Sequence, residues 1–183
     1  MLTICAINGE VLYTALYEDD HYEQLAKPAG LEVRRLIVAE ALARGVDLWG
    51  ANLARLDLHE LNFSGADLNG VDLSESTLTG ADFKGATLRS ARLNKAILGR
   101  ADFSAADLED ADLRGVVAGN ANFQHANLSF ASLGGAQLNG AHFDGARLKG
   151  INFSGADLTN ANFQAKDLVG VDLDKIIGKP HIL

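Results

Sequence analysis

The sequence has few of the residues that cross-link a chain or interrupt its structure: one cysteine and two prolines among 183 residues. A lone Cys5 excludes an internal disulfide, and its place in an apolar stretch predicts a buried, inert thiol. No apolar run approaches the roughly 20 residues of a membrane span. A basic, apolar leader and a polybasic segment are also missing. These absences predict a bacterial-type cytoplasmic protein without membrane contact.

Positive charge is scarce as well. The chain carries 16 Lys and Arg against 24 Asp and Glu, a formal net charge of −8. Direct binding to nucleic acid needs a basic stripe, so this charge argues against it. The same mild acidic excess is equally typical of an ordinary soluble domain.

A five-residue repeat runs without interruption from residue 46 to residue 175. It reads small residue, Asp or Asn, Leu or Phe, any residue, and often Gly, as in residues 66–70, and the third position departs from Leu or Phe only at Ala118. On a helix, steps of five residues turn the chain through roughly 500° each, so the apolar positions would form no stripe. The small residue and the Leu or Phe lie two apart, which is strand alternation. The last two positions predict a bend, where Gly tolerates the positive φ of a type II turn.

The phenylalanines give the number of pentads in one coil. Stacked rings need the same place in successive coils, and six phenylalanines stand twenty residues apart: Phe63, Phe83, Phe103, Phe123, Phe143 and Phe163. Four pentads therefore make one coil, and the 26 pentads of residues 46–175 make about six and a half coils. Coils stacked about 4.8 Å apart form a rod roughly 30 Å long. The sequence predicts an all-β solenoid, a four-sided β-helix with Leu and Phe inside.

This stretch resembles the pentapeptide-repeat family, whose members form a right-handed quadrilateral β-helix, and the resemblance covers about 70% of the chain. It implies a right-handed coil here. Some members, notably the quinolone-resistance proteins, resemble a DNA duplex in shape and acidity and bind DNA gyrase. These quinolone-resistance members are rod-shaped dimers joined at their C-terminal helices, and some of them carry loops that interrupt the coils. This sequence has neither the loop nor the helix, and basic residues stand among its acids: Lys84, Arg89, Arg92, Lys95, Arg114, Arg147 and Lys149.

Residues 1–45 are predicted to cap the N-terminal end of the coil, because a solenoid end exposes unpaired strand groups and its apolar interior. Two apolar stretches, 2–7 and 11–15, flank Asn8-Gly9 and predict a β-hairpin. Residues 16–30 are polar and acidic, and a further strand or turn there is left open. Residues 31–44 predict a helix that Gly45 ends, with an apolar side made by Val33, Leu36, Ile37, Ala41 and similar residues.

Larger side chains in the first coil agree with a cap that packs on it. Leu56 and Leu61 stand where most pentads have Ala, and Trp49 lies close to the junction, where we expect it to be packed, with a ligand role as the alternative.

The other end of the repeat is less regular. Lys166 stands at an inward position, where a buried ammonium is costly, so the last coil must let it reach water. Residues 176–183 form a short apolar tail that either folds over the open end or joins a second chain. The second possibility predicts a homodimer whose candidate interface is Ile176, Ile177, Ile182 and Leu183.

No pattern predicts catalysis, a cofactor or a metal site. The Asp column of the repeat points outward on a convex surface, whereas general acid–base pairs need an enclosed site. His125 and His142 lie on the same side in adjacent coils but lack further ligands at a sensible position. The sequence therefore predicts a protein that is not an enzyme.

Three departures from the repeat are candidate binding features, and each is equally compatible with neutral drift on a repeat surface. Ile97 and Val117 occupy outward positions that are mostly polar, with Gly99 and Gly119 beside them. Phe130 is an isolated aromatic residue at a corner. An acidic cluster, free of Lys or Arg between Arg100 and Arg114, is made by Asp102, Asp107, Glu109, Asp110 and Asp112.

Two functions follow from these features. The first is a non-catalytic protein-interaction or scaffold module that presents rigid flat faces to a protein partner, whose identity the sequence does not give. The alternative, implied by the family resemblance, is a DNA mimic that binds a topoisomerase such as DNA gyrase. A continuous negative stripe along one face favours the mimic, whereas a patchwork of charges favours the scaffold.

Overall fold

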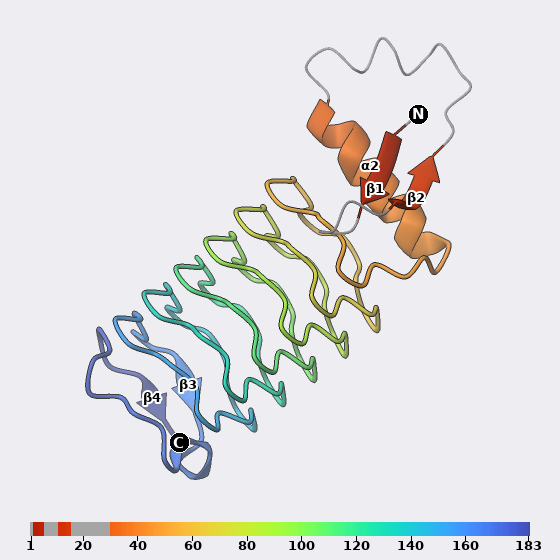
Figure 1. Ribbon diagram of the computed structural model, residues 1–183. Coiled ribbons are helices and arrows are strands. Elements are labelled where there is room, and N and C mark those ends of the chain that lie inside the picture. Colours follow the sequence, from red (N-terminus) through yellow and green to blue (C-terminus); the bar gives the residue numbers. More distant parts are fainter. Residues whose placement is uncertain (1, 6–10, 16–29) are drawn as a thin grey trace.

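The computed structural model describes residues 2–5, 11–15 and 30–183. Figure 1 shows a rod of stacked coils with a helix and two strands gathered at one end and the C-terminus at the other. The elements are β1 (Leu2–Cys5), β2 (Val11–Ala15), α2 (Gly30–Ala43), β3 (Asn162–Phe163), the 3-10 helix η1 (Ala165–Leu168) and β4 (His181–Ile182).

The coils are joined by a parallel ladder with a spacing of twenty residues. The outward residue of each pentad, except Arg147 and Asn152, pairs with the one twenty positions later, from Asn52 with Asp72 to Asp157 with Ile177. The N–H of Leu53 donates to the Asp72 carbonyl at 2.8 Å, and the N–H of Asp72 donates to the Ala51 carbonyl at 2.9 Å. Four such pairings occur in each twenty residues, so each coil has four sides.

The interior of the coil is filled by the first and third residues of each pentad. The six phenylalanines spaced by twenty form one stacked column, all with 0% exposure. Ring centroids of Phe83 and Phe103 lie 4.6 Å apart with planes 1° from parallel, and those of Phe103 and Phe123 lie 5.2 Å apart. Phe153 meets this column edge-on, 5.8 Å from Phe143. The predicted phenylalanine stack is therefore present.

The corners between sides are β-turns closed by the first residue of the next pentad, as where the Ala51 N–H donates to the Leu48 carbonyl at 3.0 Å. The fifth residue of each pentad from Gly50 to Asn160 has a positive φ, and twelve of these residues are not glycine. The Asp or Asn at the second position supports the corner, because its side-chain oxygen accepts the N–H two residues later, at 2.9 Å from Lys84 to Asp82. Much of the acidic column thus serves the fold.

At the N-terminal end, β1 pairs antiparallel with β2 from Leu2–Ala15 to Cys5–Val11. Helix α2 packs on the first coil through Ile37 and Val38, both at most 2% exposed. The predicted hairpin turn at Asn8-Gly9, residues 16–29 and the side chain of Cys5 lie outside the part that the structure describes.

The apolar side of α2 is shifted from the predicted one. Leu36, predicted on the apolar side, is 45% exposed, whereas Val38 is 1% exposed. Arg35 explains part of the shift: its Nη2 donates to the His59 carbonyl at 2.8 Å, so the face next to Val38 meets the coil. Leu56 and Leu61 are buried under this end as expected, but Trp49 is 59% exposed and the prediction that it packs at the junction is wrong.

The tail corrects another expectation. Residues 177–183 neither cross the open end nor leave the coil; they continue it, with β4 pairing parallel to β3. The Leu183 N–H donates to the Phe163 carbonyl at 2.9 Å, and the Ile177 N–H to the Ala156 carbonyl at 2.7 Å. Between β3 and residue 177, η1 replaces one regular pentad and leaves Lys166 exposed, as its charge requires.

Candidate protein-interaction surface

Ile97 and Val117 form a stacked apolar pair on one side of the rod. This side is called the Ile97 face and consists of residues 56–60, 76–80, 96–100, 116–120, 136–140 and 156–160. The two residues are bridged in the ladder and are 44% and 39% exposed. The outward residues of the coils before and after them are Thr77 and Gln137. A patch two coils long therefore interrupts a polar column, as the sequence predicted.

Gly99 and Gly119 extend this patch, and the structure shows a backbone conformation at these two glycines that the sequence did not reveal. The other glycines of the repeat from Gly50 to Gly155, apart from Gly134, have the positive φ of a corner, but these two do not. A Cβ built on Gly99 would lie 3.9 Å from the nearest atom and one on Gly119 3.7 Å, which are ordinary contacts. Neither conformation nor space requires glycine at these positions, although both lie in the predicted corners, at the fourth place of their pentads.

The interior beneath Val117 also departs from the repeat. Val116 stands where most pentads have Ala, and Ala118 stands where all others have Leu or Phe. Both have 0% exposure. The two changes offset each other in volume to within about one methylene, so the core stays filled. Three successive departures at 116–118 therefore concentrate on the Ile97 face.

Phe130 lies at a corner on another edge of the rod. It is 50% exposed and has a φ of 62°, a conformation rarely adopted by an aromatic residue. Its ring lies over the corner of the next coil, because a Cβ on Gly150 would fall 2.7 Å from Phe130 Cδ1. The Lys149 Nζ lies 5.4 Å from the ring centroid. These contacts hold the ring in place from within the chain.

Two arginines neutralise much of the acidic cluster: Arg89 from the preceding coil and Arg114 from the same coil. The Arg89 Nη1 lies 2.8 Å from Glu109 Oε2 and 3.2 Å from Asp107 Oδ2. Arg114 binds Asp112 through two nitrogens at 2.7 and 2.8 Å, and this hydrogen bonding lowers the pKa of Asp112 below its ordinary value. The hydrogen bonds that Arg89 donates to Glu109 and Asp107 raise the pKa of Arg89 in turn.

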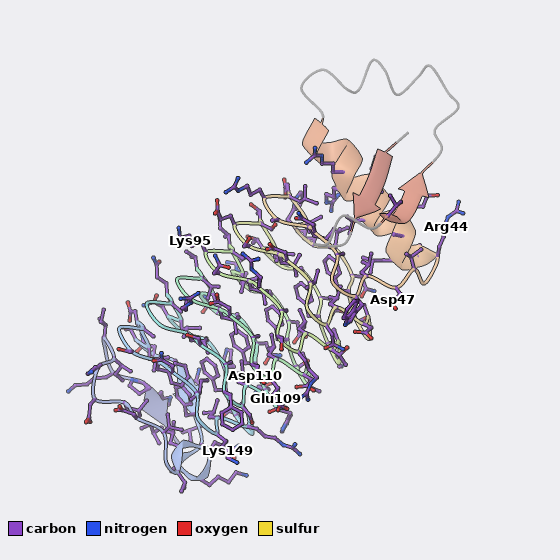
Figure 2. All side chains as sticks on the ribbon, viewed as in Figure 1. Arg44, Asp47, Lys95, Glu109, Asp110 and Lys149 are labelled. Carbon is purple, nitrogen blue, oxygen red and sulfur yellow. The ribbon has the colours of Figure 1, made fainter. Side chains whose placement is uncertain are left out.

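Amide side chains engage the rest of the cluster. Asn122 Nδ2 donates to Asp102 Oδ1 at 3.0 Å, and Asn127 Nδ2 donates to Asp107 Oδ1 at 2.9 Å. Asp110 stands exposed at a corner. The sequence showed no Lys or Arg between Arg100 and Arg114, and the pairs with Arg89 were therefore not predicted. The twenty-residue period nevertheless places Arg89 directly beside Glu109. Charge along this edge is therefore a patchwork (Figure 2).

The candidate dimer end lies within the final coil. Ile176 packs partly buried against the core, whereas Ile177, Ile182 and Leu183 are 57%, 48% and 71% exposed. These residues pair with the coil before them, and their proposed contact with a second chain stays a prediction, to be tested by light scattering on the purified protein.

Within the described residues, no group of three or more His, Cys, Asp or Glu side chains is placed to hold a metal ion. His142 Nδ1 instead lies 3.2 Å from Asn162 Nδ2. No helix among these described residues has the length and apolarity that crossing a membrane requires.

Comparisons with known proteins point to one family. The sequence matches the family described as pentapeptide repeats, in eight copies that together span residues 39–174. No curated protein matches it.

Several solved structures are similar to this chain. One is HetL, a pentapeptide repeat protein involved in heterocyst differentiation regulation from the cyanobacterium Nostoc sp. strain PCC 7120, with 23% identity, a TM-score of 0.44 and coverage of 79% of this chain and 93% of HetL. Another is the pentapeptide repeat protein Rfr23 from the cyanobacterium Cyanothece 51142, with 26% identity, a TM-score of 0.48 and coverage of 70% and 88%. A third is QnrB1, a plasmid-mediated fluoroquinolone resistance protein, with 16% identity, a TM-score of 0.39 and coverage of 74% and 85%.

The family match covers well over half of the chain, and the pentad register, the phenylalanine column and the twenty-residue ladder are all present in the structure. The chain therefore belongs to the pentapeptide-repeat family, and its coil is the right-handed β-helix of that family.

Proposed function

We propose that this protein is a non-catalytic interaction module that docks a protein partner on its Ile97 face. Pentapeptide-repeat proteins are generally structural or interaction modules. The rod suits this role because its sides are held by a continuous ladder and a filled core, so a partner meets a surface that is already ordered. We place its action in the cytoplasm.

The observation that carries the proposal is the exposed pair Ile97 and Val117 beside two glycines that the backbone does not require. Most outward positions of the repeat stabilise their own corner through an Asp or Asn side chain, and Ile and Val cannot do so. Exposed apolar residues that rest on a rigid strand and are gathered in one patch are typical of protein-binding sites.

The alternative, mimicry of DNA towards a topoisomerase such as DNA gyrase, needs carboxylates that imitate a row of phosphates. In the acidic cluster, Asp107, Glu109 and Asp112 are instead bound by Arg89 and Arg114. Those cations cancel much of the field that a mimic would present, and this observation makes the Ile97 face the better-supported site.

The test compares three forms of the protein as bait in a native lysate, with bound proteins quantified by mass spectrometry. The first is the wild type. The second is Ile97→Thr with Val117→Thr, which restores a polar column. The third is a control, Ser132→Thr with Asn152→Thr, which alters another stacked outward pair on a neighbouring side.

We expect a partner that the wild type and the control retain and that the double threonine variant loses. Equal capture by all three forms would contradict docking on the Ile97 face. Recovery of a topoisomerase by all three forms, with loss when Asp110 and Glu109 are neutralised, would transfer the function to the acidic cluster.

A further inference from the structure

Two cations stand at the edges of the Ile97–Val117 patch. Lys95 occupies the corner before Ile97 and Arg100 the corner after it, and both side chains are exposed. The stem of Lys95 reaches towards the next coil, since a Cβ on Gly115 would lie 3.7 Å from Lys95 Cγ. Figure 2 shows Lys95 on one long edge of the rod and Glu109 and Asp110 on another. The apolar patch therefore lies between two positive corners.

Neither cation has an ion pair within the described part of the chain, although arginines nearby do. Arg92 lies 3.4 Å from Asp72, and Arg114 lies 2.7 Å from Asp112. Glu75, one coil before Lys95 on the same corner, is held by Arg55 at 3.2 Å. Because these neighbouring carboxylates are already paired with arginines of the chain, they do not compensate the charges of Lys95 and Arg100.

The rest of the Ile97 face keeps carboxylates away from the patch. The coils on either side contribute Thr77 and Gln137 at the outward position. The acids in that column, Asp57 and Asp157, each stand two coils from the pair, or about 10 Å. In a chain of net charge −8, this stretch is thus locally positive around an apolar centre.

We infer that the partner of the Ile97 face binds through an acidic, amphipathic segment. Its aliphatic or aromatic side chains lie on Ile97 and Val117 and over the open surface at Gly99 and Gly119, and its flanking carboxylates pair with Lys95 and Arg100. This inference rests on the proposed function, because it describes the ligand of that same site.

Charge complementarity selects this occupant over a second copy of the chain. Two copies that meet through this face would bring positive edges against positive edges, which opposes association. An acidic segment gains from both cations at the rim while its apolar side chains are shielded from water at the centre. The gain from the rim is sensitive to salt, whereas the gain from the centre is not.

The test uses a library of random sixteen-residue peptides displayed on phage. The library is selected on the wild-type protein after depletion on the Ile97→Thr/Val117→Thr variant, so that retained peptides depend on the patch. Selected peptides are synthesised, and their affinities are measured by fluorescence anisotropy at low and at high salt.

Two charge-reversal variants then examine the edges. Lys95→Glu with Arg100→Glu reverses the rim of the patch; glutamate already occupies the same positive-φ corner position at Glu60 and Glu75, so the fold tolerates it. Lys84→Glu with Arg147→Glu reverses two other exposed cations and changes the net charge by the same amount. Circular dichroism and melting curves of both variants serve as the control for folding.

We expect selected peptides that combine Asp or Glu with Leu, Ile, Phe or Trp, and binding weakened roughly tenfold by the rim variant but little by the control. Patch-dependent peptides that are neutral or basic, or equal effects of the two variants, would overturn the acidic partner and leave docking on the Ile97 face intact. A selection that yields no patch-dependent peptide would overturn both.

Discussion

Two adjacent sides of the rod differ in how closely their residues follow the repeat. On the phenylalanine side, residues 61–65 and every twentieth equivalent, the interior is an unbroken stack of rings and the outward positions from Asn62 to Asn162 are all polar. On the Ile97 face, the pentad 116–120 has its larger inward residue first, at Val116, and its smaller one third, at Ala118. The outward column of this face is apolar at Ile97 and Val117.

The comparison separates residues that serve the coil from residues that do not. Each outward residue on the phenylalanine side between Asn62 and Asn162 has a side-chain hydrogen bond, such as Asn62 with Ser64 at 2.8 Å and His142 with Asn162 at 3.2 Å. Ile97 and Val117 can make none. A departure that contributes nothing to its own corner is the better candidate for a contact with another molecule.

The largest expected effect lies on the phenylalanine side. Phe103→Ala should lower the free energy of unfolding by roughly 3–5 kcal/mol, because the rings of Phe83 and Phe123 are held by their own coils and cannot collapse into the void. Chemical denaturation of the wild type and the variant measures the loss. An unchanged unfolding midpoint would show that the column does not support the rod.

A smaller effect is expected from forcing the Ile97 face back to the repeat. Ala118→Leu alone overfills a site that Val116 already occupies, and it should cost roughly 1–3 kcal/mol. Adding Val116→Ala restores the common Ala and Leu pair and should recover most of that loss. A double variant no more stable than Ala118→Leu would mean that the two inward residues are not coupled.

Glycine substitutions sharpen the comparison further. Gly145→Ala should cost about 1–2 kcal/mol, because Gly145 has a φ of 73° and its Cβ would fall 2.5 Å from His125 Nδ1. Gly119→Ala meets neither obstacle and should be neutral or stabilising by up to about 1 kcal/mol, since it restricts the unfolded chain. Melting temperatures of the two variants are compared directly, and equal losses would contradict the distinction between the two glycines.

The period of the sequence predicted the coil well because every pentad repeats the same physical requirement. Alternation assigned the inward Leu and Phe, and the spacing of twenty placed Phe103 on Phe123 and Ile97 on Val117. The same period predicts that Arg89 neutralises Glu109, but a search along the sequence alone missed this pair. Neighbours in such a rod are twenty residues apart, so its charges must be examined at that spacing.

Where the repeat ends, the sequence predicted less. The face of α2 was misjudged because Arg35 binds the His59 carbonyl, a contact that hydrophobic periodicity does not report. The tail pairs Phe163 with Ile182, a spacing of nineteen, because the stretch from Ile177 to His181 is one residue shorter than the stretch from Asp157 to Asn162 with which it pairs. The φ of Gly99 and Gly119 was not predicted either, because the bend was assigned to the last two positions of the pentad together, whereas the positive φ belongs to the fifth position alone.

The smallest effect on stability should accompany the largest effect on binding. In the Ile97→Thr/Val117→Thr variant, both side chains stay β-branched and keep their place in the ladder, so the free energy of unfolding should change by no more than about 0.5 kcal/mol. Thr77 and Thr87 already occupy outward positions of this coil, which shows that the site accepts the residue. Denaturation curves give the stability, and anisotropy with a patch-selected peptide gives the affinity. A loss of binding at unchanged stability shows that Ile97 and Val117 face a partner. If the variant instead unfolds more easily by several kcal/mol, the pair supports the coil, and the two sides of the rod differ in packing alone.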